Sequence, residues 1–535
     1  MAWNTTSIFT KSAHASPLPL PVLNNPFNPF SSLLITTLVT LVLTTYALLY
    51  HLQTTPLSRH EPPIIPSRLP FFGHILGMLL HGGRYVKNIG LNNPHLPIFT
   101  LPLPHSRIYI ITSPTLALPI QRLPPKLLSF TPLVPSLTRL VLNLSPSTVK
   151  ILTQNLDPLP GEKKGFLAEM HEHITQHLAP SAGGEMSILL SSLTRHLATA
   201  VVNYSTPEKE IDLLPWIRHL VASATANCFY GTQNPLATDP GLEKAFWDFD
   251  GGLGGLLLGI FPSLTARRAH LGREKLVTAF EAWLTSNKHH STDVPPIVKE
   301  RIQIALRHGF TPNAIARSEV SFLFAGIVNT ATTGFWGVLH VCFDGDLLRD
   351  IREELGVDRE TERIVWGGKK EKKLLGAVVS ECLRMNSDTY STRVVVPGEG
   401  VEVDVKEKKY WFKGGAIVQI SGGTIHSSKN NWGEDVHEFK PERFLTGGVN
   451  YKNFRAFGGG KTLCPGRHFA VAVVRLLIAM VVTRFEIEVL GERLPGKEDG
   501  VLPVHVLEPK ERVMVRVRVR DEREFGELET IGKES

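Results

Sequence analysis

The chain has 535 residues, 42% of them hydrophobic and 20% charged, which suits a large apolar core in one very large domain or two to three ordinary ones. Its net charge of +7, from 57 basic and 50 acidic residues, is too small and too scattered to indicate a nucleic-acid-binding protein. The four cysteines contain no C-x-x-C pair, so neither a disulfide framework nor a cysteine-based zinc site is indicated, and a reducing, cytosol-facing location fits.

An apolar stretch without any charged residue occupies residues 33–52. Twenty residues of helix span roughly 30 Å, the thickness of the bilayer core, so we expect a transmembrane helix. A cleaved signal peptide is the alternative, but the stretch is too long for one and no small-residue cleavage site follows. Arg59 and Arg68 after the stretch, against Lys11 before it, place the rest of the chain in the cytoplasm.

This topology fixes the expected organisation of the chain. Residues 1–32 form a luminal segment, in which Asn4 begins a glycosylation sequon. Residues 53–70 are rich in proline, which stiffens a chain, and are predicted to be a hinge. Residues 71–520 form the main domain, and the polar residues 521–535 form a disordered tail.

Within the main domain, the pattern of apolar residues predicts a mainly α-helical fold with small β-sheets. Helical periodicity dominates residues 160–390. Strand-like alternation is confined to residues 98–112, 394–420 and 484–520. Arginine at every second position from Arg512 to Arg520 predicts the solvated face of an edge strand.

An apolar, glycine-rich segment covers residues 248–264. Two interpretations remain open for it. It is either a core helix with a flexible end or a patch that dips into the bilayer, where Arg267 and Arg268 would meet lipid headgroups.

A nearly uncharged helix is predicted over residues 320–343. A second transmembrane helix is possible by length, but the polar residues within it favour a buried central helix. Gly326 lacks a Cβ and would let a ligand approach the backbone closely. Asn329 and Thr330 are the polar residues that follow it.

The next polar pattern is Glu381 and Arg384, three residues apart on one helical face, where they can pair. By itself such a pair is usually a solvated surface ion pair of little energetic worth.

A cysteine follows in a glycine-rich loop that opens an apolar helix over residues 470–482. The pattern is Phe457, two residues, Gly460, three residues, Cys464, one residue, Gly466. Backbone amides and a helix N-terminus aimed at one sulfur favour the thiolate, which suits the proximal ligand of a haem iron. The alternative is a buried cysteine beside a glycine turn.

This spacing resembles the haem-binding loop of the cytochrome P450 superfamily. Residues 439–444 strengthen the resemblance, because Arg443 would complete the family's Glu-Arg-Arg triad with Glu381 and Arg384. The resemblance covers nearly the whole chain after the anchor. It implies the cytochrome P450 fold, haem b as cofactor, and Cys464 as the ligand of the iron.

The resemblance also assigns residues to the haem pocket: Arg393, Phe457, Gly460, Gly466, Arg467 and, on the helix that passes over the haem, Gly326. Arg393 corresponds to the strand arginine that binds a haem propionate. Thr462 stands where many relatives have a basic residue, and Arg467 is a candidate to replace it.

The helix over the haem departs from the family pattern. Most relatives have an acid followed by threonine there, which relays protons to the reacting oxygen, whereas this chain has Val328 and Asn329. We therefore expect proton delivery to depend on Asn329, Thr330 and ordered water. These departures and residues 384–393 resemble the branch of sterol 7α- and 12α-hydroxylases and prostacyclin synthase.

The resemblance implies a membrane-anchored haem-thiolate monooxygenase that oxidises a hydrophobic, terpenoid- or steroid-like molecule of secondary metabolism with O₂ and electrons from NADPH. One alternative is a reductase-independent peroxide isomerase or dehydratase, and another is a non-catalytic membrane haem or lipid binder. The expected partners are the NADPH–cytochrome reductase and cytochrome b5, at a single-pass glycoprotein of the endoplasmic reticulum membrane. Lys452, Arg455 and Lys461 would form a positive docking face, or else serve only as solubilising charge.

Overall fold

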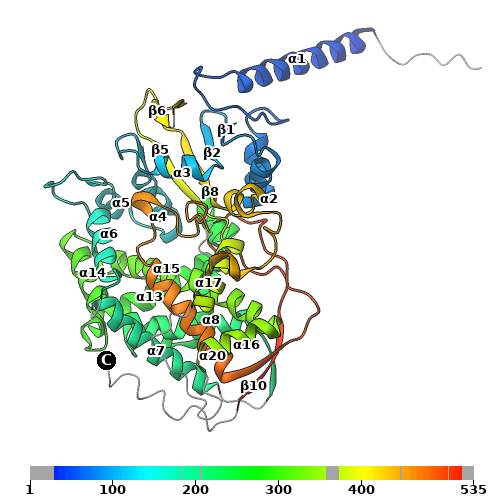
Figure 1. Ribbon diagram of the computed structural model, residues 1–535. Helices are drawn as coiled ribbons and strands as arrows, with labels where there is room; N and C mark the ends of the chain where they lie inside the picture. Colours follow the sequence, from blue (N-terminus) through cyan, green and yellow to red (C-terminus); the bar gives the residue numbers. More distant parts are fainter. Residues whose placement is uncertain are drawn as a thin grey trace, which may run out of the picture. The chain divides into compact units, whose positions relative to one another are not determined.

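The computed structural model describes residues 29–181, 184–204, 208–356, 373–405, 407–445, 449–503 and 505–520 (Figure 1). The chain divides into two units, Met1–Gln53 and Thr54–Ser535. Residues 1–28, with the predicted sequon at Asn4, and the predicted tail at residues 521–535 lie outside the described residues.

The first unit contains one described helix, α1 (Pro29–Thr54). Its segment Ser32–Thr54 contains an 18-residue window with a mean hydropathy of 2.0, and no residue of that window is buried. A helix of this length whose apolar side chains are all exposed is suited to a bilayer. It covers the predicted span at residues 33–52.

The second unit is mainly helical with small sheets, as predicted (Figure 1). Its α-helices are α2 (Gly73–Asn92), α3 (Pro114–Gln121), α4 (Val134–Leu142), α5 (Pro146–Leu152), α6 (Phe166–His177), α7 (Glu185–Asn203), α8 (Leu213–Tyr230), α9 (Pro235–Thr238), α10 (Pro240–Gly251), α11 (Leu253–Leu258), α12 (Pro262–Thr265), α13 (Arg267–Thr285), α14 (Pro296–Arg307), α15 (Pro312–Phe343), α16 (Gly345–Glu354), α17 (Lys373–Asn386), α18 (Gly422–His426), α19 (Lys429–Trp432) and α20 (Arg467–Arg484). Short 3₁₀ turns are η1 (Thr131–Leu133), η2 (Lys288–His290), η3 (Pro441–Phe444) and η4 (Gly460–Thr462).

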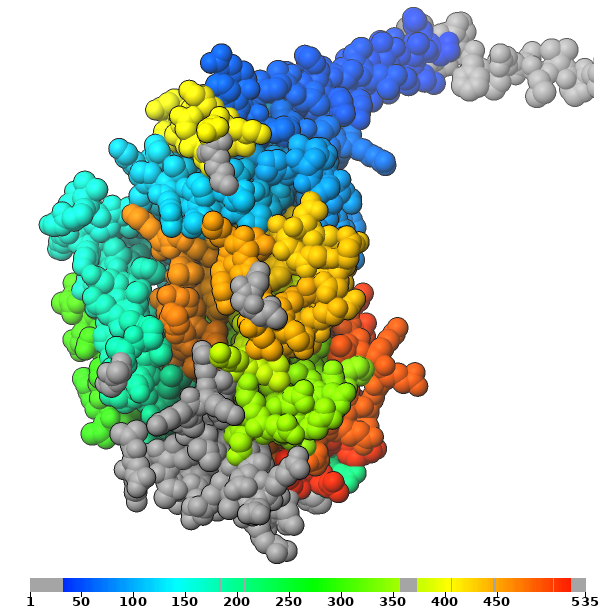
Figure 2. Space-filling view, in the orientation of Figure 1, coloured from blue at the N-terminus to red at the C-terminus, as the bar shows by residue number. Residues whose placement is uncertain are grey.

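The strands form three small sheets. They are β1 (Ile98–Pro102), β2 (Arg107–Ile111), β3 (Leu128–Ser129), β4 (Lys209–Asp212), β5 (Tyr390–Val395), β6 (Val401–Val405), β7 (Lys408–Phe412), β8 (Ile417–Ser421), β9 (Phe485–Val489) and β10 (Met514–Val519). One sheet has the order β1-β2-β8-β5-β3, the second β4-β10-β9 and the third β6-β7. In Figure 2 the blue-to-cyan residues of β1, β2 and α3 adjoin the yellow residues of β6 and β7, so distant parts of the chain share this end of the unit.

The prediction of an edge strand at the alternating arginines is wrong. β10 lies in the middle of its sheet, antiparallel to both β4 and β9. Arg516 is balanced by acids on both neighbours, with Nη2 2.9 Å from Glu210 of β4 and Nη1 2.6 Å from Glu488 of β9. Cross-strand opposite charges stabilise such a pairing, so a charged face does not require an edge.

Helix α15 crosses the core of the unit, as expected of the helix predicted over residues 320–343. It packs against α8, α13, α20 and α17, and 72% of its most apolar window is buried, so it is a buried helix of the core. It begins at Pro312, earlier than predicted, because the Thr311 side chain caps the N–H of Ala314 and proline suits the first helical position.

The end of the proline-rich hinge is attached to the first sheet. Ile65 N–H donates to Thr100 O (3.0 Å), and Thr100 N–H donates to Pro63 O (2.8 Å). Residues 63–65 therefore extend β1 by a short parallel bridge at Ile64.

Candidate haem site

The site is built around the loop between η4 and α20, which carries Cys464. Cys464 N–H donates to Phe457 O (3.1 Å), which closes the loop into a turn. Gly466 is the N-cap of α20, so the sulfur lies at the N-terminus of this helix. Phe457 packs against the main hydrophobic core and ties the loop to it.

The protonation of Cys464 reflects opposing influences. Burial raises the pKa of the Cys464 thiol, while a hydrogen bond from Gly466 N–H and the charge of Arg467 lower it. Burial prevails, so the protein alone favours the thiol. A bound metal ion would deprotonate it, because coordination outweighs burial.

The glycines before Cys464 allow the backbone of the loop to approach α3 closely. Gly460 has a φ of +63°, and a Cβ there would lie 2.6 Å from Gln121 O. At Gly459 a Cβ would lie 2.4 Å from Gln121 Oε1. We expected these glycines to let several backbone amides approach the sulfur of Cys464. Among the described residues, only Gly466 N–H donates a hydrogen bond to that sulfur.

Arg393 of β5 faces this loop. It is buried, and its Nη2 donates to Thr462 Oγ1 (2.8 Å) and to Gly459 O (3.3 Å). Thr462, which stands where many members of the resembled family have a basic residue, thus accepts a hydrogen bond from Arg393. Arg467, the candidate replacement, donates from Nη1 to Cys464 O (3.2 Å).

Arg455 is a residue of the site that the sequence analysis missed. It is only 8% exposed, so it does not belong to a docking face, whereas Lys452 and Lys461 are exposed. Its Nη1 donates to Gln121 Oε1 (3.1 Å). Its buried Nε and Nη2 have no hydrogen-bond partner among the residues that the structure describes.

A small cavity lies beside Arg455 and is lined by residues of α3, β5 and the cysteine loop, namely Gln121, Thr389, Tyr390, Ser391, Ile420, Gly422, Arg455 and Gly458. A buried guanidinium stays charged, and leaving two of its donor nitrogens unpaired is costly. An anionic group of a ligand would satisfy them. The signal in the sequence is weak, because Gln121 and Arg455 are 334 positions apart.

Glu381, Arg384 and Arg443 are brought together. Arg384 forms a bidentate pair with Glu381, at 2.6 and 2.7 Å, and both side chains are buried. Arg443 Nε lies 3.4 Å from Glu381 Oε1, as an ion pair without hydrogen-bond geometry. Arg443 donates instead to Trp432 O and Asp435 O. The network ties α17 to η3 and the segment that precedes the cysteine loop.

One face in the middle of α15 is exposed, although most of this helix is buried. Ser321, Ala325 and Asn329, spaced four residues apart, form this face. Asn329 Oδ1 accepts the N–H of Val506 (2.9 Å), so its amide group remains as a donor. Thr330 points about 100° away around the helix and is buried.

Gly326 faces α8. A Cβ there would lie 3.1 Å from Phe229 Cε2 and 3.5 Å from Thr225 Cγ2. In this structure the glycine permits close helix packing, which differs from the close approach of a ligand that the sequence predicted.

The relatives of the chain identify the family. The family model for cytochrome P450 matches residues 258–515, which include the cysteine loop and both parts of the arginine–glutamate network. The chain belongs to the cytochrome P450 superfamily. It is 29% identical to the cytochrome P450 monooxygenase nodJ of Hypoxylon pulicicidum, over 87% of this chain and 91% of that protein.

Other fungal relatives agree with this assignment. A cytochrome P450 monooxygenase of Gibberella zeae is 26% identical over 83% of this chain and 84% of its own length. The cytochrome P450 monooxygenase poxD of Penicillium oxalicum is 23% identical over 84% and 92%. The chain is therefore a cytochrome P450 monooxygenase, with haem b as its cofactor and a redox partner as its source of electrons.

The described residues fit a haem. A thiol at a helix N-terminus supplies a sulfur ligand, and two buried arginines, Arg393 and Arg455, offer positive charge for carboxylates. The unpaired donors of Arg455 favour an anion in particular.

Proposed function

We propose that Cys464 would hold the haem iron through its sulfur and that this enzyme oxygenates a hydrophobic molecule, terpenoid- or steroid-like, in secondary metabolism. The observation that carries the proposal is the meeting of the Cys464 loop with Arg393 and Arg455, of which Arg455 retains unpaired buried donors. Phe457, Gly460, Gly466 and Arg467 hold this loop in place.

In this proposal, Arg393 and Arg455 bind the propionates and orient the cofactor. When bound, haem supplies the activation of O₂ for insertion of one oxygen atom into a C–H bond. The exposed face of α15 lines the substrate side, where Ala325 offers apolar contact. Asn329 Nδ2 donates a hydrogen bond to ordered water but has no acidic proton to release, so water must deliver the protons.

The proposal extends to the surroundings of the enzyme. Helix α1 would anchor it in the endoplasmic reticulum membrane with the second unit in the cytoplasm, as the excess of arginine after residue 52 supports. Electrons would come from NADPH through a reductase, with cytochrome b5 as a further donor. Lys452 and Lys461, both exposed near the cysteine loop, support an acidic partner surface there.

The test is the reduced carbon-monoxide difference spectrum of microsomes that contain the full chain. The native protein is expected to show the thiolate-ligated absorption band, and Cys464→Ala is expected to lose it together with all turnover. Cys342→Ala is the matched control, because Cys342 is a free cysteine of α15 outside the loop. Turnover retained by Cys464→Ala would reject the proposal.

A second candidate is a peroxide isomerase or dehydratase that needs no reductase. It is favoured by the face of α15, where Ser321, Ala325 and Asn329 include no acid. The nearest acid on the helix, Glu319, is buried and paired with Arg301 at 3.0 Å. Product formed from a lipid peroxide without NADPH would support this candidate, and incorporation of labelled O₂ with NADPH would support the monooxygenase.

A further inference from the structure

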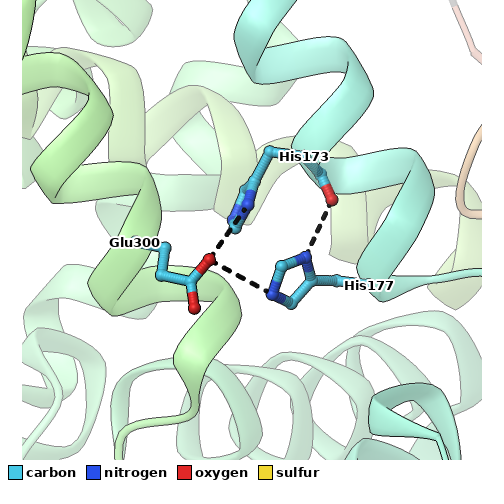
Figure 3. A group of neighbouring side chains, drawn as sticks. All are labelled: His173, His177 and Glu300. Atoms are coloured by element: carbon cyan, nitrogen blue, oxygen red, sulfur yellow. Dashed lines mark hydrogen bonds and ion pairs between the residues drawn. The ribbon is translucent and has the colours of Figure 1, made fainter.

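Two histidines and a glutamate converge away from the cysteine loop (Figure 3). His173 and His177 lie one turn apart on α6, and Glu300 reaches toward them from α14. Glu300 Oε2 lies 3.5 Å from His173 Nδ1 and 3.6 Å from His177 Nε2. The three candidate ligand atoms all lie within 4.8 Å of one another.

Both imidazole rings are oriented by backbone carbonyls. His173 Nε2–H donates to Ile297 O (2.9 Å), and His177 Nδ1–H donates to His173 O (2.9 Å). In the neutral rings, the lone pairs of His173 Nδ1 and His177 Nε2 therefore face the carboxylate of Glu300. A backbone carbonyl that accepts the N–H of the ring nitrogen away from the ion is typical of histidines that bind a metal.

A second carboxylate lies against one of the two histidines. Glu185, the first residue of α7, has Oε2 2.9 Å from His177 Nε2. Its other oxygen is fixed by the N–H of Ile297 (2.9 Å). A nitrogen lone pair that faces carboxylate oxygens needs a cation between them, either a proton or a metal ion.

We propose that His173, His177 and Glu300, with Glu185 as fourth ligand, bind a divalent transition metal ion of the zinc type. Two imidazoles and a carboxylate whose ligand atoms lie within 4.8 Å of one another suit Zn²⁺, whereas Mg²⁺ and Ca²⁺ prefer oxygen ligands alone. Glu300 is 56% exposed, so its side chain is free to close on the ion while the helices stay in place.

The ion would join α6, α14 and the start of α7. Leu178, directly after α6, lies beside Gly466 of the cysteine loop, at 3.5 Å from the place of a Cβ on that glycine. The metal is therefore structural, and it holds the end of α6 next to the loop that carries Cys464. This site is independent of the haem ligand itself.

The test uses the full-length protein, purified without a histidine tag, treated with a chelator and titrated with Zn²⁺ by calorimetry. The native protein is expected to bind one Zn²⁺ per chain and to melt at a higher temperature with Zn²⁺ than with Mg²⁺. His177→Ala and Glu300→Gln are each expected to weaken binding at least tenfold. His171→Ala is the matched control, since His171 lies on the same helix and is exposed.

Folding of each variant is checked by its carbon-monoxide difference spectrum, which the metal ligands do not contribute to. Zinc-edge X-ray absorption of the loaded protein is expected to show imidazole nitrogens at about 2.0–2.1 Å. The proposal is overturned if the native protein shows no saturable binding of Zn²⁺. It is also overturned if folded Glu300→Gln binds Zn²⁺ as tightly as the native protein, or if His171→Ala loses binding.

Discussion

At the scale of single residues, the cysteine loop is defined as much by two buried arginines as by the cysteine. Arg393 finds its partners within the protein, on Thr462 and Gly459. Arg455 does not, because its Nε and Nη2 are unpaired within the described part of the chain. A buried cation without an anion destabilises the protein alone and favours binding of an anionic ligand.

We predict opposite effects of Arg455→Met on the protein with and without haem. A charge-assisted hydrogen bond contributes about 1.5–3 kcal/mol, so loss of the guanidinium is expected to weaken haem binding at least tenfold. The haem-free protein should be as stable as the native one or more so, because the unpaired charge is gone. Haem transfer to apomyoglobin and urea unfolding of the haem-free protein measure the two effects.

Lys452→Met is the control, since Lys452 is an exposed cation of the same loop region. It should change neither quantity. Equal haem retention in Arg455→Met and Lys452→Met would mean that Arg455 does not contact the cofactor.

The second prediction at this scale concerns Asn329. Asn329→Thr should preserve haem binding and change the ratio of product formed to NADPH consumed, because a hydroxyl replaces the amide donor on the exposed face of α15. Thr332→Val is the control, as Thr332 is buried and bonds Val328 O of its own helix (3.0 Å). A ratio that stays at the native value in both variants would remove Asn329 from proton delivery.

At the scale of elements, short-range patterns predicted what the chain forms but not how charges are neutralised. We predicted that the central helix begins at residue 320 because the charged residues end just before it, but α15 begins at Pro312. Its Arg317 pairs with Glu274 of α13 at 2.7 Å, and Glu319 pairs with Arg301 of α14. The sequence cannot reveal such pairs, because the partners lie far apart along the chain.

The distance between partners along the chain also explains which parts of the candidate site the sequence could predict. The Cys464 loop and the Glu381–Arg384 pair are local motifs, so the sequence was sufficient to propose them. Arg455 was misplaced because its burial depends on Gln121, a residue of a distant helix. The strand β10 was taken for an edge because the acids that balance Arg516 lie on β4 and β9.

The short helix α18 links two elements through His426, and this link predicts a dependence on pH. His426 Nδ1–H donates to Ser387 O, and Nε2 accepts the N–H of Arg455 (2.8 Å). Burial lowers the pKa of His426 from 6.5 to about 4, although the bond to Ser387 opposes this. The unfolded chain therefore binds more protons between pH 6.5 and 4, and stability falls as the pH decreases through this window.

By pH 5 the loss amounts to about 2 kcal/mol, most of what this one histidine contributes. Urea unfolding at pH 7 and pH 5 measures it, with His426→Gln as comparison. The variant should lose about 2 kcal/mol less than the native protein over this interval, since other histidines affect both proteins alike. Identical losses would show that His426 titrates normally in the folded state.

At the scale of the whole molecule, the second unit carries its own apolar surface. The segment at residues 248–264, for which two interpretations were open, forms the end of α10, then α11 and α12. Leu253 and Leu256 of α11 are buried, whereas Phe261 and Leu264 are 74% and 78% exposed. The first half of the segment is thus core, and the second half, with Leu258 and Ile260 also exposed, favours contact with a bilayer.

We predict that this patch gives the second unit membrane affinity independent of α1. A chain lacking residues 1–53 should still bind phospholipid vesicles, and Phe261→Ser with Leu264→Ser should weaken that binding at least tenfold, since each large apolar side chain contributes about 1.5–3 kcal/mol when transferred from water. Leu306→Ser, on α14, removes another exposed leucine and is the control. Sedimentation with vesicles measures the binding. If the double variant sediments like the Leu306→Ser control, the exposed side chains of α12 and its N-terminal flank do not enter the bilayer, and any vesicle binding of this shortened chain comes from another part of the second unit.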